Sequence, residues 1–212
     1  MPVTLTFDNG PSAGTTQRVL DILAGHGVQA TFFVVGTALG QPGARAVATR
    51  AVQEGHWVGN HSMSHAIPLG VDPDPVHAVR EIDDAERIIA GLAHERRFFR
   101  PFGGGGHIGP HLLSPATVDR LCAAGYSCVL WNSVPRDWED PMGWVDVALA
   151  DVARLEHAVV VLHDLPTGAM DKLDEFLGRL EAEGLPVVQD FPDSVVVIDR
   201  GVAGELDGLV SA

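Results

Sequence analysis

The stretch "TLTFDNGPS", residues 4–12, is a short strand-like pattern that ends abruptly in an acid, an amide and a glycine. Asp, Asn and Gly are favoured in turns, so Asp8, Asn9 and Gly10 could simply stop a strand. The C-terminal end of a strand is also where α/β barrels carry their active-site residues. The rest of the sequence decides between these two interpretations.

Strand-like and helix-like patterns alternate along the chain. The strand patterns cover Val3–Phe7, Ala30–Val35, His56–Gly59, Arg97–Arg100, Ser127–Trp131, Ala158–Leu162 and Pro186–Val188. The helical patterns cover Thr16–Ala24, Ala44–Glu54, Pro75–Leu92, Pro115–Ala124, Trp144–Leu155 and Met170–Glu183. Such alternation predicts βαβ units and a mainly parallel sheet. Roughly seven units favour closure into a (β/α)7-type barrel, and we expect one domain over residues 1–212. The tail at Ser194–Ile198 would pack outside this barrel or complete it.

Composition excludes several classes of function. The chain has 212 residues and a formal net charge of −14, so we expect no binding to nucleic acid or to anionic lipid. It holds two cysteines, Cys122 and Cys128, which predict free thiols rather than a disulfide framework. No apolar run reaches the roughly 18 residues of a membrane span. A strand pattern that starts at Val3 leaves no room for a signal peptide, so we expect a cytoplasmic protein.

Ionisable side chains follow five of the predicted strands. They are Asp8, the pair His61 and His65, Arg100, Asp137 and His163. Because the loops at the C-terminal rim of an α/β barrel converge on one mouth, we expect these side chains to meet there. Each has a plainer interpretation when taken alone, as a surface histidine, a structural ion-pair partner, a loop acid or a buried core histidine. The repeated placement favours one shared site.

Two further features bear on that site. His61 and His65 stand four residues apart, a spacing that puts both imidazoles on one face of a short helix, as a metal site requires. Residues Gly103–Gly106 form a run of four glycines. Such a run suits either a close approach of the backbone to another group or a flexible connector.

Five motifs in this order resemble those of a known family. The segments "TFDNGP", "HSMSH", "FRPFG", "RDW" and "LHD" are similar to the motifs of polysaccharide deacetylases with a NodB homology domain, carbohydrate esterase family 4. The resemblance spans about Thr4 to Asp164 and implies the family's distorted (β/α) barrel. It also implies hydrolytic removal of the N-acetyl group from an N-acetylated saccharide, with release of acetate.

The resemblance assigns the base and the metal ligands. Asp8 corresponds to the general base, and His61 and His65 correspond to two metal ligands. Asn9 stands where the family has a second, metal-binding aspartate. A divalent, zinc-like ion held this way would activate water and polarise the carbonyl group.

The remaining roles also follow from the resemblance. Arg100 would pair with the base and His163 would be the general acid. Phe102 would offer its backbone N–H to the oxyanion, Trp138 would form the aromatic wall of the substrate groove, and Leu162 would line the acetyl pocket.

Two positions depart from the family pattern. An amide oxygen can bind a divalent ion but lacks the carboxylate's charge, so Asn9 predicts a weakly bound metal or none. Val134 occupies a position where the family often has an acid, whereas Asp137, counted among the catalytic residues, is kept. These departures suggest a divergent branch.

Three functions therefore remain in competition. The first is N-deacetylation of a saccharide, and the second is hydrolysis of another small amide with little or no metal dependence. The third is an inactive, carbohydrate-binding pseudoenzyme. The acid–base residues Asp8, Arg100 and His163 favour the first two, because binding alone does not need them.

Overall fold

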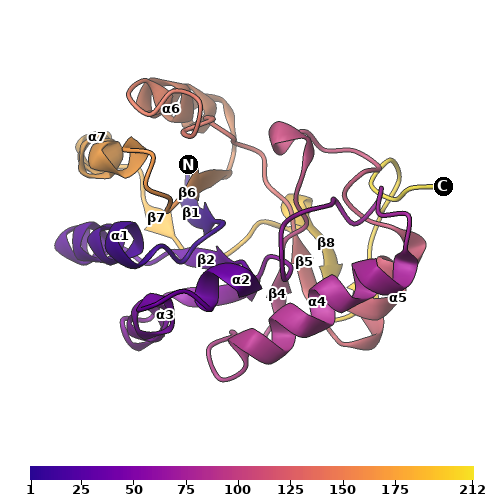
Figure 1. The fold of residues 1–212 in the computed structure, drawn as a ribbon. Helices are drawn as coiled ribbons and strands as arrows, with labels where there is room; N and C mark the ends of the chain where they lie inside the picture. Colours follow the sequence, from indigo (N-terminus) through magenta and orange to yellow (C-terminus); the bar gives the residue numbers. More distant parts are fainter.

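A computed structural model describes residues 1–212 as a single curled sheet surrounded by helices (Figure 1). The strands are β1 Val3–Asp8, β2 Thr31–Val34, β3 Trp57–Asn60, β4 Phe98–Phe99, β5 Ser127–Val129, β6 Ala158–His163, β7 Val187–Val188, β8 Val196–Asp199 and β9 Val202–Ala203. The α-helices are α1 Ala13–His26, α2 Gly36–Leu39, α3 Ala44–Gln53, α4 Pro75–Ile89, α5 Pro115–Ala123, α6 Trp144–Arg154 and α7 Leu173–Ala182. Short 3-10 helices cover Gly104–Gly106, Ala169–Lys172 and Asp193–Val195.

The sheet has nine strands, of which eight run in the order β6-β1-β2-β3-β4-β5-β8-β9. The neighbouring pairs from β6 to β5 are all parallel, as the alternation of strands and helices predicted. An isolated parallel bridge between Ser133, just after β5, and Val160 of β6 brings the two sides of the curl together. The distorted barrel expected from the sequence is confirmed.

The last strands depart from a regular seventh barrel unit. Strand β7 pairs only with Val3 and Thr4, at the beginning of β1. The C-terminal tail joins the sheet as β8, which runs antiparallel to β5 and carries β9 on its outer side. The sequence left open whether this tail packs outside the barrel or completes it. In the structure, the tail extends the sheet beyond β5.

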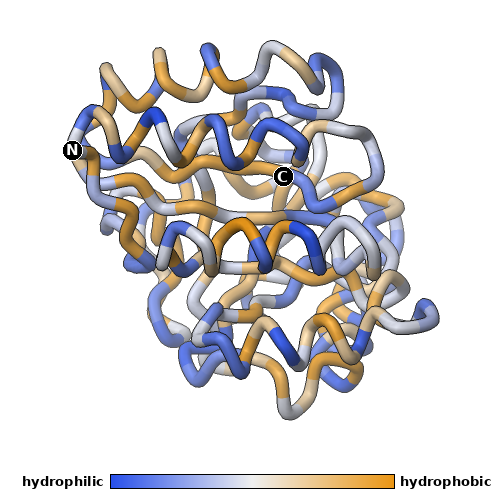
Figure 2. Tube along the Cα trace, turned by 90° about the vertical axis from the view of Figure 1, so that its left-hand side faces the viewer, coloured by the Kyte–Doolittle hydropathy of each residue, from blue (hydrophilic) through white to orange (hydrophobic).

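Strand β1 shows how alternation in sequence sets up the site. Its residues Val3, Leu5 and Phe7 belong to a core cluster shared with α1, α3, α6 and α7. Successive side chains of a strand point to opposite faces, so Thr6 and Asp8 lie on the other face. Figure 2 shows hydrophobic strands at the centre, with helices that alternate between hydrophobic and hydrophilic residues around them. The helices thus cover the apolar face and leave the polar face of β1 to the interior of the curl.

A second core cluster supports the remaining strands. It joins β4, β5 and the face of β6 that bears Val159 and Val161 to α4 and α5 through Ile82 and Leu121. Both cysteines are free, as predicted, with Cys128 buried and Cys122 half-buried. None of the helices combines the length and the hydrophobicity needed to span a lipid bilayer.

Candidate active site

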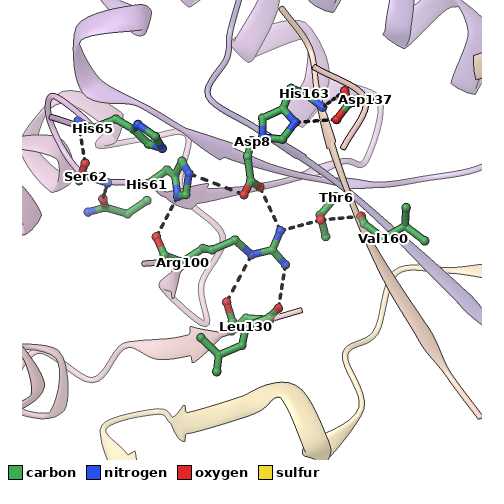
Figure 3. Close-up of polar contacts among 12 residues, drawn as sticks. Thr6, Asp8, His61, Ser62, His65, Arg100, Leu130, Asp137, Val160 and His163 are labelled. Carbon is green, nitrogen blue, oxygen red and sulfur yellow. Dashed lines mark hydrogen bonds and ion pairs between the residues drawn. The ribbon is translucent and has the colours of Figure 1, made fainter. Parts of the chain in front are cut away.

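Of the predicted rim residues, Asp8, His61, His65 and His163 line one pocket of about 360 Å³. Arg100 and Asp137 do not line it, but they contact Asp8 and His163. The pocket is lined by Asp8, Asn9, His61, His65, Pro101, Phe102, Gly103, Gly105, Gly106, Trp131, Val134, Trp138, Val161, His163 and Leu165. Parallel strands β1, β3, β4 and β6 end around it, so one rim collects groups from distant parts of the chain. Figure 3 shows Asp8 between the His61, Arg100 and His163 side chains. Asp8 and Asn9 therefore line the pocket as well as ending strand β1.

Asp8 and Arg100 form a buried ion pair beneath the pocket. Nη1 of Arg100 lies 3.0 Å from Oδ1 of Asp8, and the two side chains are 0% and 6% exposed. The other guanidinium contacts are also satisfied, because Arg100 donates to Oγ1 of Thr6 and to the carbonyl oxygens of Val129 and Leu130. A guanidinium hydrogen-bonded at all three nitrogens holds its partner in a single orientation. Arg100 thus fixes the Asp8 carboxylate, as expected, and Thr6 is a supporting residue that the sequence did not reveal.

His61 presents a neutral imidazole to the pocket. Its Nδ1–H donates to the carbonyl oxygen of Arg100 over 2.8 Å, which leaves Nε2 with its lone pair, 3.6 Å from Oδ2 of Asp8. Burial lowers the pKa of His61 to about 3. A ring held neutral, with one nitrogen fixed by a carbonyl group, has the form in which histidine binds metals.

His65 lies beside His61, although no helix carries the pair. The ring centroids are 5.0 Å apart, and the His65 ring stacks on Phe102 at 4.0 Å. Burial lowers the pKa of His65 as well. The expected short helix is wrong, since residues 61–65 form a bent loop in which Ser62 and His65 have φ of 69° and 54°.

Asn9 completes this side of the pocket. Its backbone has φ of 73°, a left-handed conformation that asparagine tolerates better than most residues. Its Oδ1 atom is buried and has no hydrogen-bond partner. Nowhere in the chain do three or more His, Cys, Asp or Glu side chains form a group that could hold a metal ion. Any metal at this pocket would therefore depend on the unpaired amide oxygen of Asn9 together with the two imidazoles.

His163 is held by Asp137 on the opposite side. Asp137 is completely buried and accepts hydrogen bonds from Nδ1 of His163 at 2.8 Å and from its backbone N–H at 3.0 Å. Burial alone disfavours protonation, but the Asp137 hydrogen bond and the nearby carboxylates outweigh it and raise the pKa of His163. The rings of Trp138 and His163 pack edge to face, with their centroids 4.8 Å apart. The predicted residues Asp137, Trp138 and His163 thus form one unit.

One predicted substrate contact is wrong. Leu162 is fully buried in the core cluster on the helix-covered face and does not line the pocket. His163 faces the pocket, so its neighbour Leu162 must face away, whereas Val161 shares the side of His163. Val161 and Leu165 supply the apolar lining here in place of Leu162.

The glycine run approaches other groups closely. All four residues have positive φ, between 59° and 121°. A Cβ atom on Gly104 would lie 2.6 Å from Nε2 of His111, and one on Gly106 would lie 2.7 Å from Val134. Nε1 of Trp131 also donates to the carbonyl oxygen of Gly106. Of the two interpretations, close backbone approach fits the structure, because the run forms one wall of the pocket.

Comparisons with known proteins agree with this architecture. The family model described as polysaccharide deacetylase matches residues 1–121. A chitooligosaccharide deacetylase from Bradyrhizobium sp. (strain ANU 289) is 36% identical over 168 residues, covering 76% of this chain and 70% of that protein. The peptidoglycan-N-acetylmuramic acid deacetylase PdaC of Bacillus subtilis (strain 168) is 31% identical over 187 residues, covering 88% and 37%. The chain thus spans between 37% and 70% of the length of these two relatives.

Solved structures lead to the same family. A family 4 acetyl xylan esterase from Clostridium thermocellum, in complex with a cobalt ion, aligns with a TM-score of 0.70 and 29% identity over 89% of this chain and 87% of that one. A mutant of a family 4 pseudoenzyme with restored enzymatic activity aligns with a TM-score of 0.70 and 26% identity, over 87% and 64%. Because a family model covers more than half of the sequence and these structures share its fold, the chain belongs to the polysaccharide deacetylases, a family of hydrolytic enzymes.

Proposed function

We propose that this protein hydrolyses the N-acetyl group of an N-acetylated saccharide and releases acetate. The observation that carries the proposal is the placement of an acid–base pair, the buried Asp8 and the half-buried His163, in one pocket. Amide hydrolysis needs a base to take a proton from water and an acid to give one to the leaving amine. A carbohydrate-binding pseudoenzyme would need neither group.

Asp8 is the general base in this proposal. Arg100 holds one carboxylate oxygen, Oδ1, by hydrogen bonding. The other oxygen, Oδ2, has His61 Nε2 at 3.6 Å and is available to accept the proton of an attacking water. Because Arg100 fixes Oδ1, the orientation of Oδ2 is fixed as well.

His163 is the general acid. Asp137 occupies Nδ1, so Nε2 is the nitrogen that can give its proton to the departing amine. The raised pKa of His163 keeps a larger protonated fraction near neutral pH than an unperturbed imidazole would have. Asp137 thus orients the ring and favours its protonated form.

The residues present fit a weakly held divalent metal. His61 and His65 are neutral imidazoles, and Asn9 Oδ1 is a buried oxygen that nothing in the protein satisfies. When bound, such an ion would supply a water of lowered pKa and a Lewis acid for the substrate's carbonyl oxygen. Two neutral imidazoles and an amide bring no negative charge, so we expect weaker binding than an aspartate at position 9 would give.

The rest of the pocket binds and orients the substrate. The backbone N–H of Phe102 makes no hydrogen bond within the protein and could donate to the oxyanion. Trp138 offers an aromatic face for a sugar ring, while Val161 and Leu165 provide an apolar lining for the acetyl methyl group.

A second candidate is hydrolysis of a different small amide without metal. The observation that favours it is the neutral Asn9, which leaves the chain without three clustered His, Cys, Asp or Glu side chains. Both candidates use the same acid and base, and they differ in substrate and in the response to metal.

The test is acetate release from N-acetylated oligosaccharides and release of acid from small amides, with zinc, cobalt or a chelator present. Acetate from a saccharide, stimulated by zinc or cobalt, supports the first proposal. Turnover of a non-sugar amide that a chelator leaves unchanged supports the second. Silence on every substrate at saturating metal would overturn both and favour a pseudoenzyme.

A further inference from the structure

The loop that carries both pocket imidazoles holds an unfavourable backbone conformation. Ser62 and His65 have φ of 69° and 54°, and neither residue is glycine. Left-handed conformations at such residues cost about 1–3 kcal/mol each unless the surrounding structure fixes them. Residues 61–65 therefore need external support to hold both rings at the pocket.

Part of this support comes from the loop and from β3. Oδ1 of Asn60 accepts the N–H of Ser62 over 2.9 Å, and Oγ of Ser62 accepts the N–H of His65 over 3.0 Å. Asn60 is itself anchored, because its Nδ2 donates to the carbonyl oxygen of Ile82 in α4. The carbonyl oxygens of Ser62 and Met63 also accept the backbone N–H groups of Gly36 and Thr37 in α2, at 3.0 and 2.8 Å. Within the loop, Ser64 is the residue that these contacts do not hold.

Helix α4 holds Ser64 through Glu81. Oε2 of this side chain accepts two hydrogen bonds from Ser64, one from the backbone N–H at 2.8 Å and one from Oγ at 2.9 Å. The second oxygen, Oε1, lies 3.9 Å from Nε2 of His77. Glu81 is only 7% exposed. Glutamate is rarely so buried unless it is paired, and here both close contacts of Oε2 go to the loop.

We propose that Glu81 is a positioning residue that holds the loop 61–65 in the conformation in which His61 and His65 bind metal together. The inference rests on the metal site of the proposed function. Ser64 is exposed, so water can replace the carboxylate when Glu81 is removed. The protein should then stay folded while the loop gains freedom.

The first test measures metal affinity by zinc titration calorimetry of the full chain. Removing a supporting contact around metal ligands typically weakens binding about 10- to 100-fold. We expect Glu81→Ala to raise the Kd for zinc about tenfold or more. Glu81→Gln keeps an oxygen for both Ser64 hydrogen bonds and should stay within about threefold of wild type. A matched control is Asp84→Ala on the same helix, which removes an exposed acid paired with Arg87 and should change nothing.

The second test needs no metal. Backbone amide hydrogen exchange of Ser64 and His65 should be about tenfold faster in metal-free Glu81→Ala than in wild type, with α4 unchanged and with recovery in Glu81→Gln. Equal exchange in wild type and Glu81→Ala would overturn the positioning role. Absence of zinc binding by the wild type, with faster exchange in Glu81→Ala, would refute the metal site and leave the structural role of Glu81 standing.

Discussion

The Asp137→Asn substitution tests whether Asp137 favours the protonated form of His163, the proposed general acid. Asp137 is fully buried and accepts two hydrogen bonds from His163, one from Nδ1 and one from the backbone N–H. Asparagine has the same shape but no charge, and its single oxygen cannot replace both carboxylate oxygens. The variant therefore removes the Asp137 contribution that favours the protonated ring, while burial still opposes protonation and the carboxylates of Asp8 and Asp164 still favour it.

The size of the effect follows from the contact that is lost. A hydrogen bond to a charged group contributes about 1.5–3 kcal/mol, and 1.36 kcal/mol corresponds to a factor of ten in an equilibrium constant. The proton affinity of His163 should fall about 10- to 100-fold. At pH values above the pKa of His163 in wild type, the protonated fraction falls by the same factor, so kcat/KM should fall by a similar factor there. The alkaline limb of the pH profile should move to lower pH.

Two measurements check this expectation. A pH titration of the His163 ring by NMR should place its protonation at lower pH in Asp137→Asn than in wild type, and the pH profile of acetate release should move with it. Asp171→Asn removes an exposed acid paired with Arg18 and serves as the control. Unchanged or higher proton affinity of His163 in Asp137→Asn would refute the role given to Asp137.

Three other substitutions test separate parts of the site. Asn9→Asp adds the missing negative charge beside the two imidazoles, and calorimetry should show at least about tenfold tighter zinc binding, whereas equal affinity would exclude position 9 as a ligand. Arg100→Met leaves the carboxylate of Asp8 buried without its cation, which should lower the free energy of unfolding by about 3–5 kcal/mol in urea. Burial raises the pKa of Asp164 from 3.8 to about 6, so the folded state binds this proton more tightly and stability falls as the pH rises between those values. Asp164→Asn, which can still accept from Thr16, should remove that slope and raise the free energy of unfolding at pH 7 by about 2–3 kcal/mol; an unchanged slope would contradict it.

The strand ends were the most predictable part of the site. Asp8, Arg100 and His163 each follow an apolar strand pattern, and parallel strands deliver their C-terminal ends to one rim whatever the loops between them do. Sequence order and strand polarity therefore suffice to bring these groups together. In the structure Asp8 and His163 line one pocket, and Arg100 contacts Asp8.

The alternation of side chains along the strand predicts that Leu162 lies outside the pocket. Once His163 is placed in the pocket, the period of two along a strand sends Leu162 to the opposite face and Val161 to the same one. The structure follows the alternation.

Other features had no local signal. The spacing of His61 and His65 suits a helix, but the loop takes left-handed turns at Ser62 and His65. Contacts with α2, Asn60 and Glu81, all distant in sequence or outside the helical pattern, stabilise those turns. Glu81 looks like any surface acid of an amphipathic helix, because what distinguishes it is a partner 17 residues away in the chain. The pairing of the tail with β5 is likewise a long-range contact that composition does not specify.

The hydrolytic proposal meets its most direct test in acetate released from a chitooligosaccharide by wild type and by Asp8→Asn, both saturated with zinc and both shown to be folded. We expect release by the wild type and a loss of at least about 100-fold in the variant, since the base is removed while the shape of the pocket is kept. Equal release by the two proteins would contradict the role of Asp8, and no release by either would contradict the proposed activity.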